Sequence, residues 1–412
     1  MITAYPQKVT DVCAMVSMHK QTKEVIIITI HQKKKNLIKI IYNIYMVINI
    51  NRQSLVEPLK NIIGVSEQNQ TMPILGHVLM EIKEGVCFLT ATDLEVQVSF
   101  SYDIGVSENI RITVPARKFT DILRSLEAEN VTLEVTPKDI VIKSGKSKFR
   151  VSALNPDDFP IITDDISDCM KIDSEALLKL VNSTSFSMGY QDARHFLNGL
   201  FIEFSENNIT AVATDGHRLA CSLRACELSS SEKSCIVPRK CINELKRILS
   251  SFNGNNDTLT EVSVSSKNIQ FCMHGYTLLS KLVEGNYPDY NKVFPKSLPN
   301  NLKVDRLLLK SALQRLSILS SEQFKGVKFK LNNALLNLST INSQQESGDE
   351  IIECDYGGDE LEIGFNLSYL LETLDVIDTQ HIVIHLGGSD SGCLVTADGD
   401  ESSKYIIMPM RV

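Results

Sequence analysis

The residues whose types and spacing come closest to catalytic chemistry are Asp215 and His217, with Cys221 nearby. A carboxylate beside an imidazole can transfer protons near neutral pH, and a thiol can act as a nucleophile. However, Thr214–Leu219 also has the composition of an ordinary turn, and no nucleophile motif or oxyanion loop accompanies it. Catalysis is therefore the weaker interpretation, and we expect no catalytic residue.

Other candidate sites for small ligands are no stronger. The run Gly387–Gly392 could cradle a phosphate, but it lies between two apolar runs, where a hairpin loop is expected. The carboxylates of Asp398, Asp400 and Glu401 lack the spacing of an EF-hand loop. The sequence has neither of the glycine-rich nucleotide motifs, G-x-x-x-x-G-K-[ST] and G-x-G-x-x-G. We therefore expect no cofactor and no metal.

Composition narrows the class of protein further. The ten cysteines are scattered and form no C-x-x-C pair, so the usual zinc spacing is missing. The sequence lacks a secretory signal and an apolar stretch of about 20 residues that would span a membrane. We expect reduced thiols in a cytoplasmic protein. The net charge of −8 argues against a simple nucleic-acid coat, but one basic face can still contact DNA.

Three similar segments of the chain must position these residues. A polar cap followed by a helix recurs at Ile50–Leu55, Ile172–Leu177 and Val304–Leu309. A strand that runs into a second helix recurs at Val114–Phe119, Val237–Ile242 and Phe365–Leu370. Successive copies of each landmark are between 122 and 132 residues apart. Two independent landmarks with nearly one period indicate a domain that occurs three times.

Each repeat contains two helical patterns and many short strand patterns. We therefore expect an α+β fold of three tandem similar domains, each with two helices backed by antiparallel sheets. The predicted domains are residues 46–165, 170–289 and 290–412. Short segments that contain proline separate them, as is typical of connectors between rigid units.

The first repeat illustrates the local predictions. Asn51 is expected to cap a helix, because its side chain can accept a free helical N–H. Pro58 lies inside that helix and predicts a late start or a bend. Three strands are then predicted at residues 74–82, 86–91 and 95–100, and a second helix is predicted after Pro115.

Residues 1–45 stand outside the repeats. They are rich in Lys, Ile, Asn and Tyr, which A/T-rich codons encode, and they show no continuing helix or strand period. We expect translated upstream sequence with the real start at Met46, and the alternative is a genuine but poorly ordered tail. Peptides from before Met46 in a mass spectrum of the native protein would exclude the first interpretation.

Several motifs occur in order along the chain and carry a family likeness: Thr214–Leu219, Ser280–Gly285, Pro288–Tyr290, Glu362–Asn366 and Met408–Arg411. Together they resemble the bacterial DNA polymerase III beta subunit family, the sliding clamps, over residues 46–412. The resemblance implies a non-catalytic processivity factor for the replicative polymerase. It also implies a head-to-tail homodimer in which six similar domains form a closed ring around duplex DNA. A ring holds DNA by topology and needs only weak, mobile phosphate contacts.

Basic side chains on the predicted helices could line the hole of such a ring: Lys60, Arg124, Lys240, Lys246, Arg247, Lys310 and Arg315. The alternative is that they are ordinary solvated helix faces, and the last helix of repeat three has no Lys or Arg. The resemblance adds DNA contacts at Arg117, Gln191, His195 and Phe196. Phe196 keeps a flat face that can stack on a base. Asn69 replaces an arginine of the family pattern, so no contact is carried over there.

The resemblance also implies a hydrophobic groove that binds partner peptides with a glutamine and spaced Leu or Phe anchors. The matching residues are Leu197, Thr214, Gly216, His217, Arg218, Leu219, Pro288, Lys292, Val293, Ile406, Ile407, Met408, Pro409, Met410, Arg411 and Val412. Lys292 replaces an arginine of the family pattern and loses a fork of donors. Without the family, Ile406–Met410 would be interpreted as a last core strand.

Ring closure is implied at the two ends of the chain. The matching residues are Lys146, Lys148, Phe149 and Val151 on one side and Ile318, Leu319, Phe324, Glu346, Asp349 and Glu350 on the other. The alternative for the acidic set is a solvated loop. The implied partners are a second copy, duplex DNA without sequence preference, an ATP-driven clamp loader, the polymerase III catalytic subunit, and other polymerases, mismatch-repair proteins and ligases. A nucleoid association follows from these partners. An interaction scaffold that never encircles DNA is the remaining rival.

Overall fold

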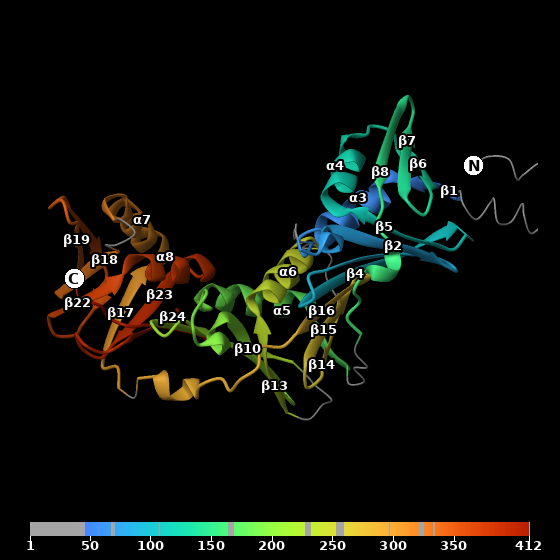
Figure 1. Ribbon diagram of the computed structural model, residues 1–412. Helices are drawn as coiled ribbons and strands as arrows, with labels where there is room; N and C mark the ends of the chain where they lie inside the picture. Colours follow the sequence, from blue (N-terminus) through green and yellow to red (C-terminus); the bar gives the residue numbers. More distant parts are fainter. Residues whose placement is uncertain are drawn as a thin grey trace, which may run out of the picture. The chain divides into compact units, whose positions relative to one another are not determined.

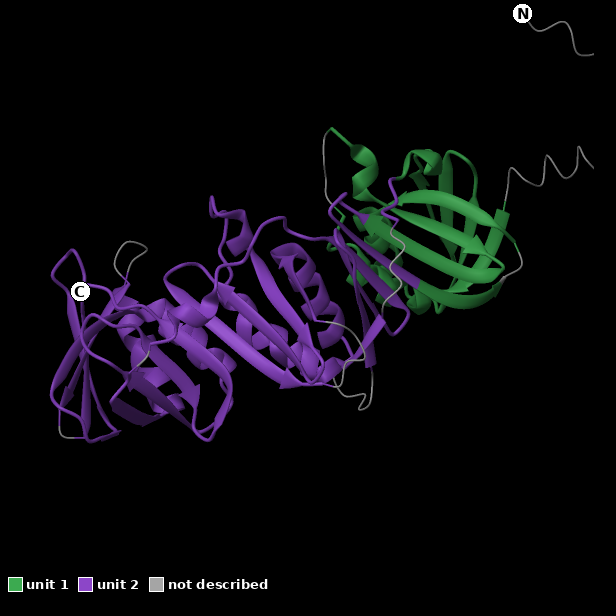
Figure 2. Cartoon of the chain, turned by 90° about the horizontal axis from the view of Figure 1, so that it is seen from below, with its two compact units in different colours: residues 1–91, 101–159 green, residues 92–100, 160–412 purple. Residues whose placement is uncertain are grey.

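The computed structural model describes residues 46–66, 71–106, 108–163, 169–226, 232–252, 259–295, 297–320, 325–332 and 334–411 (Figure 1). The predicted extension, residues 1–45, lies outside the described residues, and so do Asn69, Phe324 and Val412. The described chain divides into two compact units (Figure 2). Unit 1 contains residues up to 91 and residues 101–159, and unit 2 contains residues 92–100 and those from 160 onward.

Unit 1 is built from the first repeat. Its helices are α3 (Arg52–Ile62) and α4 (Ala116–Ser125), with 3-10 turns η2 (Pro73–Gly76) and η3 (Pro156–Asp158). One antiparallel sheet has the order β1-β6-β7-β8, formed by Met46–Asn51, Asn130–Val135, Asp139–Ser144 and Ser147–Ser152. The strands β5 (Ile110–Pro115), β2 (His77–Lys83) and β3 (Gly85–Thr92) lie side by side in a second sheet. Strand β4 (Val96–Val106) begins in unit 2, which holds residues up to Phe100.

The second repeat lies in unit 2. Its helices are α5 (Ser174–Thr184) and α6 (Arg239–Ser250), with 3-10 turns η4 (Ser185–Ser187) and η5 (His195–Asn198). Its strands are β9 (Cys169–Asp173), β10 (Gly199–Ser205), β11 (Asn208–Thr214), β12 (Arg218–Ala225), β13 (Lys233–Pro238), β14 (Leu259–Val264), β15 (Asn268–Met273) and β16 (Tyr276–Lys281).

The third repeat completes unit 2. Its helices are α7 (Arg306–Leu316) and α8 (Leu367–Val376), with 3-10 turns η6 (Tyr290–Val293) and η7 (Ser317–Leu319). Its strands are β17 (Asn300–Asp305), β18 (Gly326–Asn332), β19 (Leu335–Ile341), β20 (Ser347–Glu353), β21 (Asp355–Tyr356), β22 (Leu361–Asn366), β23 (His381–Leu386), β24 (Cys393–Ala397) and β25 (Asp400–Ile407).

The strand register shows how neighbouring repeats join. Residues 96–100 of β4 pair antiparallel with β16, and β12 pairs antiparallel with β25. In each case the fourth strand of one repeat meets the last strand of the next. The corresponding strands that remain are β20 and β8, and each lies at the edge of its own four-stranded sheet.

Equivalent side chains begin the first helix of each repeat. Asn51 accepts hydrogen bonds from the backbone N–H groups of Gln53 and Ser54 and so caps α3 as predicted. Asp173 and Asp305 cap α5 and α7 in the same manner. A side-chain cap typically stabilises a helix by about 1 kcal/mol, so the three starts are fixed by local chemistry.

Apolar side chains on the helices are buried against the sheets. Phe119 and Leu123 of α4 and Leu309 and Leu313 of α7 are buried completely. Burial of each such side chain contributes about 2 kcal/mol before cavity effects are counted. None of the helices in the described ranges has the length and apolar character needed to cross a membrane.

Two local predictions for the first repeat were wrong about where an element begins: the late start of the first helix, and the start of the first strand at residue 74. Helix α3 begins at Arg52 and continues through Pro58, because the cap at Asn51 and the buried face with Leu55 and Leu59 hold it despite the lost N–H. The strand predicted from residue 74 begins at His77, because Pro73 opens a 3-10 turn that buries Ile74. The glycine-rich run 387–392 connects the antiparallel strands β23 and β24, as predicted.

Candidate functional site

The turn between β11 and β12 is fixed by its own side chains. Asp215 Oδ1 accepts from the backbone N–H groups of His217, at 2.9 Å, and Arg218, at 3.0 Å. Thr214 Oγ1 accepts from Gly216 N at 3.0 Å and donates to Arg218 O at 2.6 Å. Gly216 has a φ of 90°, a conformation that glycine adopts without steric cost. The Asp215 carboxylate therefore holds the turn through the backbone N–H of His217 and not through its imidazole.

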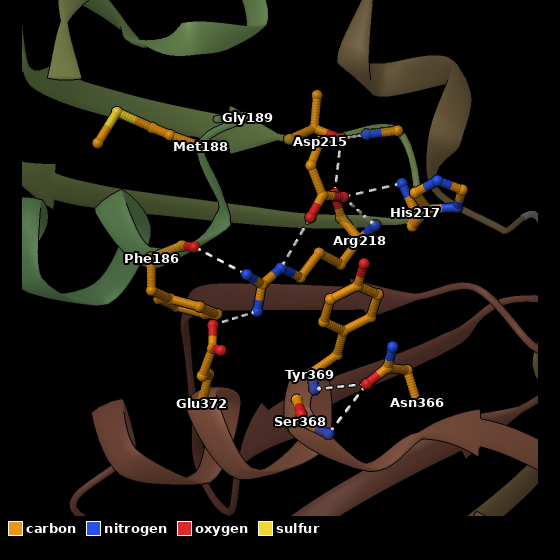
Figure 3. A network of polar contacts seen from close by, with 12 residues as sticks. Phe186, Met188, Gly189, Asp215, His217, Arg218, Asn366, Ser368, Tyr369 and Glu372 are labelled. Carbon is orange, nitrogen blue, oxygen red and sulfur yellow. Dashed lines mark hydrogen bonds and ion pairs between the residues drawn. The ribbon is translucent and has the colours of Figure 1, made fainter. Parts of the chain in front are cut away.

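Arg218 joins the second repeat to the third (Figure 3). Its guanidinium contacts Asp215 Oδ2 at 3.1 Å, Glu372 Oε2 at 2.5 Å and the carbonyl oxygen of Phe186 at 2.9 Å. It also lies 4.4 Å from the ring centroid of Tyr369. Only 9% of Arg218 is exposed. Its donors are thus used inside the protein, and its role at this site is to hold two walls together.

Helix α8 carries Glu372, whose carboxylate accepts a hydrogen bond from Arg218. The side chain of Asn366 caps α8 by accepting from the backbone N–H groups of Ser368 and Tyr369 (Figure 3). Tyr369 and Glu372 are three residues apart and lie on one helix face. The cap therefore determines where the ring and the carboxylate meet Arg218.

The last strand supplies a second wall. Ile406 and Ile407 are buried in β25, so the alternative interpretation as core strand holds for this part. The chain then leaves the core: Met408 N donates to His217 O and Met410 N donates to Gly364 O, both at 2.9 Å. Met408 is 43% exposed and Met410 is 39% exposed. The flexible apolar side chains of Met408 and Met410 are thus exposed to solvent, while the backbone N–H of each residue is fixed by a hydrogen bond.

An apolar cluster lies beneath this wall. It contains Val212, Leu219 and Ile406, and partly buried rings of Tyr287 and Tyr290 pack against it. Burial raises the pKa of the Tyr290 hydroxyl, which donates to Glu203 at 2.7 Å. These tyrosines come from the linker before repeat three, so the linker closes one side of the cluster.

The other predicted groove residues are distributed unevenly around this cluster. Val293 is 45% exposed, and Lys292, also exposed, pairs with Asp289 at 3.3 Å. Pro288 and Arg411 are exposed as well, whereas Leu197 is buried. The structure therefore groups the predicted residues into a buried floor and an exposed rim.

The loop before β10 carries three of the predicted DNA contacts. Gln191 is exposed with a left-handed φ of 53°, His195 is exposed and Phe196 is half-buried. Arg194 anchors this loop through a two-point pair with Asp192, at 3.0 and 2.8 Å, and it also donates to the backbone of the Asp215 turn at 3.3 Å. The arginine lowers the pKa of the Asp192 carboxyl to about 2. Sequence reasoning missed Arg194, because only the fold brings it to the turn.

Most basic residues of the predicted DNA-facing helices have acidic partners in this chain. Lys240 pairs with Asp93 and Arg247 with Glu244. Lys60–Glu57, Lys310–Asp375 and Arg315–Glu350 are further ion pairs, with N–O distances of 2.6 to 2.7 Å. Within the described residues, the exposed side chains of Lys246 and Arg124 make no such pair. Arg117, on the first turn of α4, is also exposed.

The residues predicted to close a ring lie on or near the edge strands. Lys146, Lys148 and Phe149 are exposed at β8, whereas Val151 is buried. Beside β20, Ile318 is 80% exposed, and Leu319 is half-buried.

The acidic residues on or next to β20 differ in their hydrogen-bond partners. Glu346 accepts from Asn342 Nδ2 at 2.7 Å, Asp349 is exposed, and Glu350 accepts two hydrogen bonds from Arg315. The Arg315 pair lowers the pKa of Glu350. Glu350 therefore already has a cation within its own chain.

Comparison with known proteins accounts for these features together. Models of the N-terminal, central and C-terminal domains of the DNA polymerase III beta subunit match residues 46–163, 171–289 and 291–411. The chain belongs to the DNA polymerase III beta subunit family. Beta sliding clamps are 38% identical to it in Pseudomonas putida, over 88% of this chain and 99% of the relative, and 36% identical in Escherichia coli strain K12, over 89% and 100%.

Solved structures of the family agree. A DNA polymerase sliding clamp from Pseudomonas aeruginosa superposes with a TM-score of 0.84 at 37% identity, over 89% of this chain and 100% of that one. A clamp from Caulobacter crescentus gives 0.82 at 30% identity, over the same shares. The predicted α+β fold of three clamp domains is confirmed. The chain is a processivity clamp of DNA polymerase III and a non-catalytic subunit.

Proposed function

We propose that this clamp works as a head-to-tail dimer that encloses duplex DNA and tethers partner proteins through the groove around Met408 and Met410. The domains of each copy are residues 46–165, 170–289 and 290–412. The observation that carries the proposal is the pairing rule between repeats: β4 pairs with β16 and β12 with β25. Because β20 and β8 are left as edge strands, a second copy can satisfy the same rule at each end.

Charge and apolar surface at these edges favour this pairing. Lys146 and Lys148 lie at β8, and Glu346 and Asp349 lie at β20, so the two edges have opposite signs. Exposed ion pairs add only about 0–1 kcal/mol each, so they set register more than strength. Burial of Ile318 would supply about 2 kcal/mol at each joint. Backbone hydrogen bonds between the paired edge strands would add to this apolar contact, and a clamp loader would have to break both to open the joint.

The DNA contacts that we propose are individually weak and independent of sequence. Arg117, Gln191, His195 and Lys246 are exposed and can contact phosphates without reading sequence, while Phe196 offers a flat ring. Because Lys240 and Arg247 are engaged within the chain, they contribute less positive potential than a count of basic residues suggests. A modest, salt-dependent attraction allows sliding.

The groove serves several partners in turn. A peptide with spaced Leu and Phe side chains would place its anchors on Met408, Met410 and Val293, above the apolar cluster. The partners are the polymerase III catalytic subunit, the clamp loader, and other polymerases, mismatch-repair proteins and ligases that carry such peptides. A dimer offers two grooves, so weak contacts gain by avidity while partners still exchange. The clamp acts in the cytoplasm, at the nucleoid.

Sedimentation equilibrium tests the assembly. The wild-type chain should have about twice its own mass of 46.0 kDa. Ile318→Asp should give the single-chain mass with unchanged circular dichroism, because the buried charge opens both joints. Leu259→Asp, at a side chain with 56% exposure on β14 of the second repeat, is the matched control and should stay dimeric. A single-chain mass for the wild type at micromolar concentration would contradict the proposal.

A further inference from the structure

The turn between β3 and β4 repeats the groove turn atom for atom. Asp93 Oδ1 accepts from the backbone N–H groups of Glu95, at 2.9 Å, and Val96, at 2.6 Å. Thr92 Oγ1 accepts from Leu94 N at 3.1 Å and donates to Val96 O at 3.0 Å. These are the bonds that Asp215 and Thr214 make 122 residues later.

The neighbouring strand repeats its bonds as well. Lys281 N donates to Glu95 O at 2.9 Å, as Met408 N does to His217 O. Val283 N donates to Ile236 O at 2.9 Å, as Met410 N does to Gly364 O. Leu94, Lys281 and Val283 therefore occupy the backbone positions that Gly216, Met408 and Met410 occupy at the groove.

A large pocket lies beside the turn Thr92–Val96 and the segment Lys281–Val283, which together we call the second frame. All of the residues that line the pocket belong to unit 2. Its volume is about 1240 Å³. Leu94, Ile161 and Leu282 give it apolar walls, and Ile161 is 45% exposed. A volume of this size can take several side chains of an extended peptide.

One wall of the pocket offers a strand edge. Ser234 and Ile236 lie on β13, the first strand in the order of its nine-stranded sheet. Ile236 O accepts from Val283, so it points away from β10, the neighbour of β13. The N–H and C=O of Ser234, two residues earlier, point to the same side. An added strand can therefore form backbone hydrogen bonds there.

The charges at the pocket favour an acidic occupant. Lys267 and Lys281 line it and are exposed, and neither forms an ion pair with another described residue. Glu284 is the single acidic side chain among the lining residues that the structure describes. The wall is thus net positive, and a carboxylate on the occupant would be attracted to the two lysines.

We infer that this pocket is a second peptide-binding site, which adjoins the apolar cluster of the groove at Tyr287 and takes an extended acidic segment with alternating apolar side chains. The segment pairs with β13 through its backbone, places apolar side chains against Leu94 and Ile161, and directs carboxylates to Lys267 and Lys281. The junction of repeats one and two would thus offer a docking site with the same turn and strand hydrogen bonds as the groove at the junction of repeats two and three.

The test uses the full chain and a fluorescein-labelled peptide in which Asp and Leu alternate. Fluorescence anisotropy should show saturable binding to the wild type. Ile161→Asp, and the double change Lys267→Glu with Lys281→Glu, should each weaken binding about tenfold or more. Met408→Asp at the groove and Ile341→Asp on β19 are controls and should leave the affinity unchanged. All of these side chains are exposed, so the variants are expected to fold.

Three results would overturn the inference. The first is no saturable binding to the wild type at millimolar protein. The second is a loss of affinity with Met408→Asp but not with Ile161→Asp, which would place the peptide in the groove. The third is equal affinity for a peptide in which Lys replaces Asp, because the two lysines would then play no part. None of these results bears on ring assembly, which the sedimentation experiment measures separately.

Discussion

The turns Thr92–Val96 and Thr214–Arg218 share one backbone and differ at their last three positions, of which the third and the fifth have the largest consequences. The left-handed position holds Leu94, with a φ of 80°, in one turn and Gly216, with a φ of 90°, in the other. The last position holds buried Val96 in one and Arg218 in the other. The repeat therefore supplies the frame, and these two positions determine how each frame is used.

The partners of the two aspartates follow from this difference. Asp215 Oδ2 pairs with Arg218, which reaches onward to Glu372 of the next repeat. Val96 has no charge to offer, so Asp93 pairs instead with Lys240 of α6. At the groove the aspartate is part of a connection between repeats two and three, whereas at the other turn it takes up a cation of the predicted DNA-facing set.

Arg218→Met should have the largest effect on stability. It removes the cation from Asp215, whose side chain is 19% exposed, and from the more exposed Glu372, and it breaks the bond to the Phe186 carbonyl, so we expect a loss of about 2–3 kcal/mol in the free energy of unfolding. The matched change, Lys240→Met, should cost less, about 1 kcal/mol, because the Lys240 side chain is 30% exposed, whereas that of Arg218 is 9% exposed and bonds to two carboxylates and a backbone carbonyl. Urea unfolding of both variants measures the difference. Equal losses would mean that the connection to α8 adds nothing.

Substitutions at the two left-handed positions, Leu94 and Gly216, should change stability by different amounts. Gly216→Leu forces a branched residue into a positive φ and places its Cβ 3.1 Å from Arg194 Nη2, so we expect a loss of about 1–2 kcal/mol. Leu94→Gly relieves the same strain and should change stability by less than about 1 kcal/mol. Thermal unfolding checks both. If Gly216→Leu is as stable as the wild type, the turn does not require its glycine.

The fold was predictable because it repeats. Three caps and three strand-to-helix junctions recur at similar spacing, and Asn51, Asp173 and Asp305 perform locally the roles that their sequence neighbours indicate. The identities of the groove residues came from family motifs. What escaped prediction depends on distant packing, such as the pair between Lys240 and Asp93.

The same limit explains the other differences. Burial of Arg218 depends on Tyr369 and Glu372, which lie some 150 residues further along the chain, so the sequence shows an arginine but not that its donors are used. Arg194 next to Asp192 looks like an ordinary surface pair until the fold places it under the Asp215 turn. The helix continues through Pro58 because tertiary burial outweighs local propensity.

Substitution at the exposed rim should affect binding without affecting stability. Met408→Ala should weaken binding of a peptide with Gln, Leu and Phe anchors about tenfold, because it removes apolar contact area. Lys281→Ala, at the equivalent backbone position of the other frame, should leave this affinity unchanged. Isothermal titration calorimetry compares the two. Equal losses of affinity in the two variants would show that the peptide does not distinguish the groove from the equivalent site beside the turn Thr92–Val96.

The smallest expected effect concerns pH. Because Arg194 lowers the pKa of Asp192 from 3.8 to about 2, the pair stabilises the folded state fully above about pH 5 and progressively less as the pH falls toward 2. Asp192→Asn should remove this acid-side dependence and leave the trend above pH 5 unchanged. Unfolding midpoints measured from pH 2 to 6 provide the test. Parallel curves for both proteins would contradict the assigned pair.

Enclosure of DNA is tested most directly by release from its ends. The clamp is loaded onto nicked circular DNA with a clamp loader and ATP, the free protein is removed, and half of the sample is linearised with a restriction enzyme. The account predicts that the protein stays on the circles and is lost from the linear molecules within minutes. Equal retention on both forms would contradict it, because a protein that binds DNA or its partners by adhesion alone does not respond to free ends.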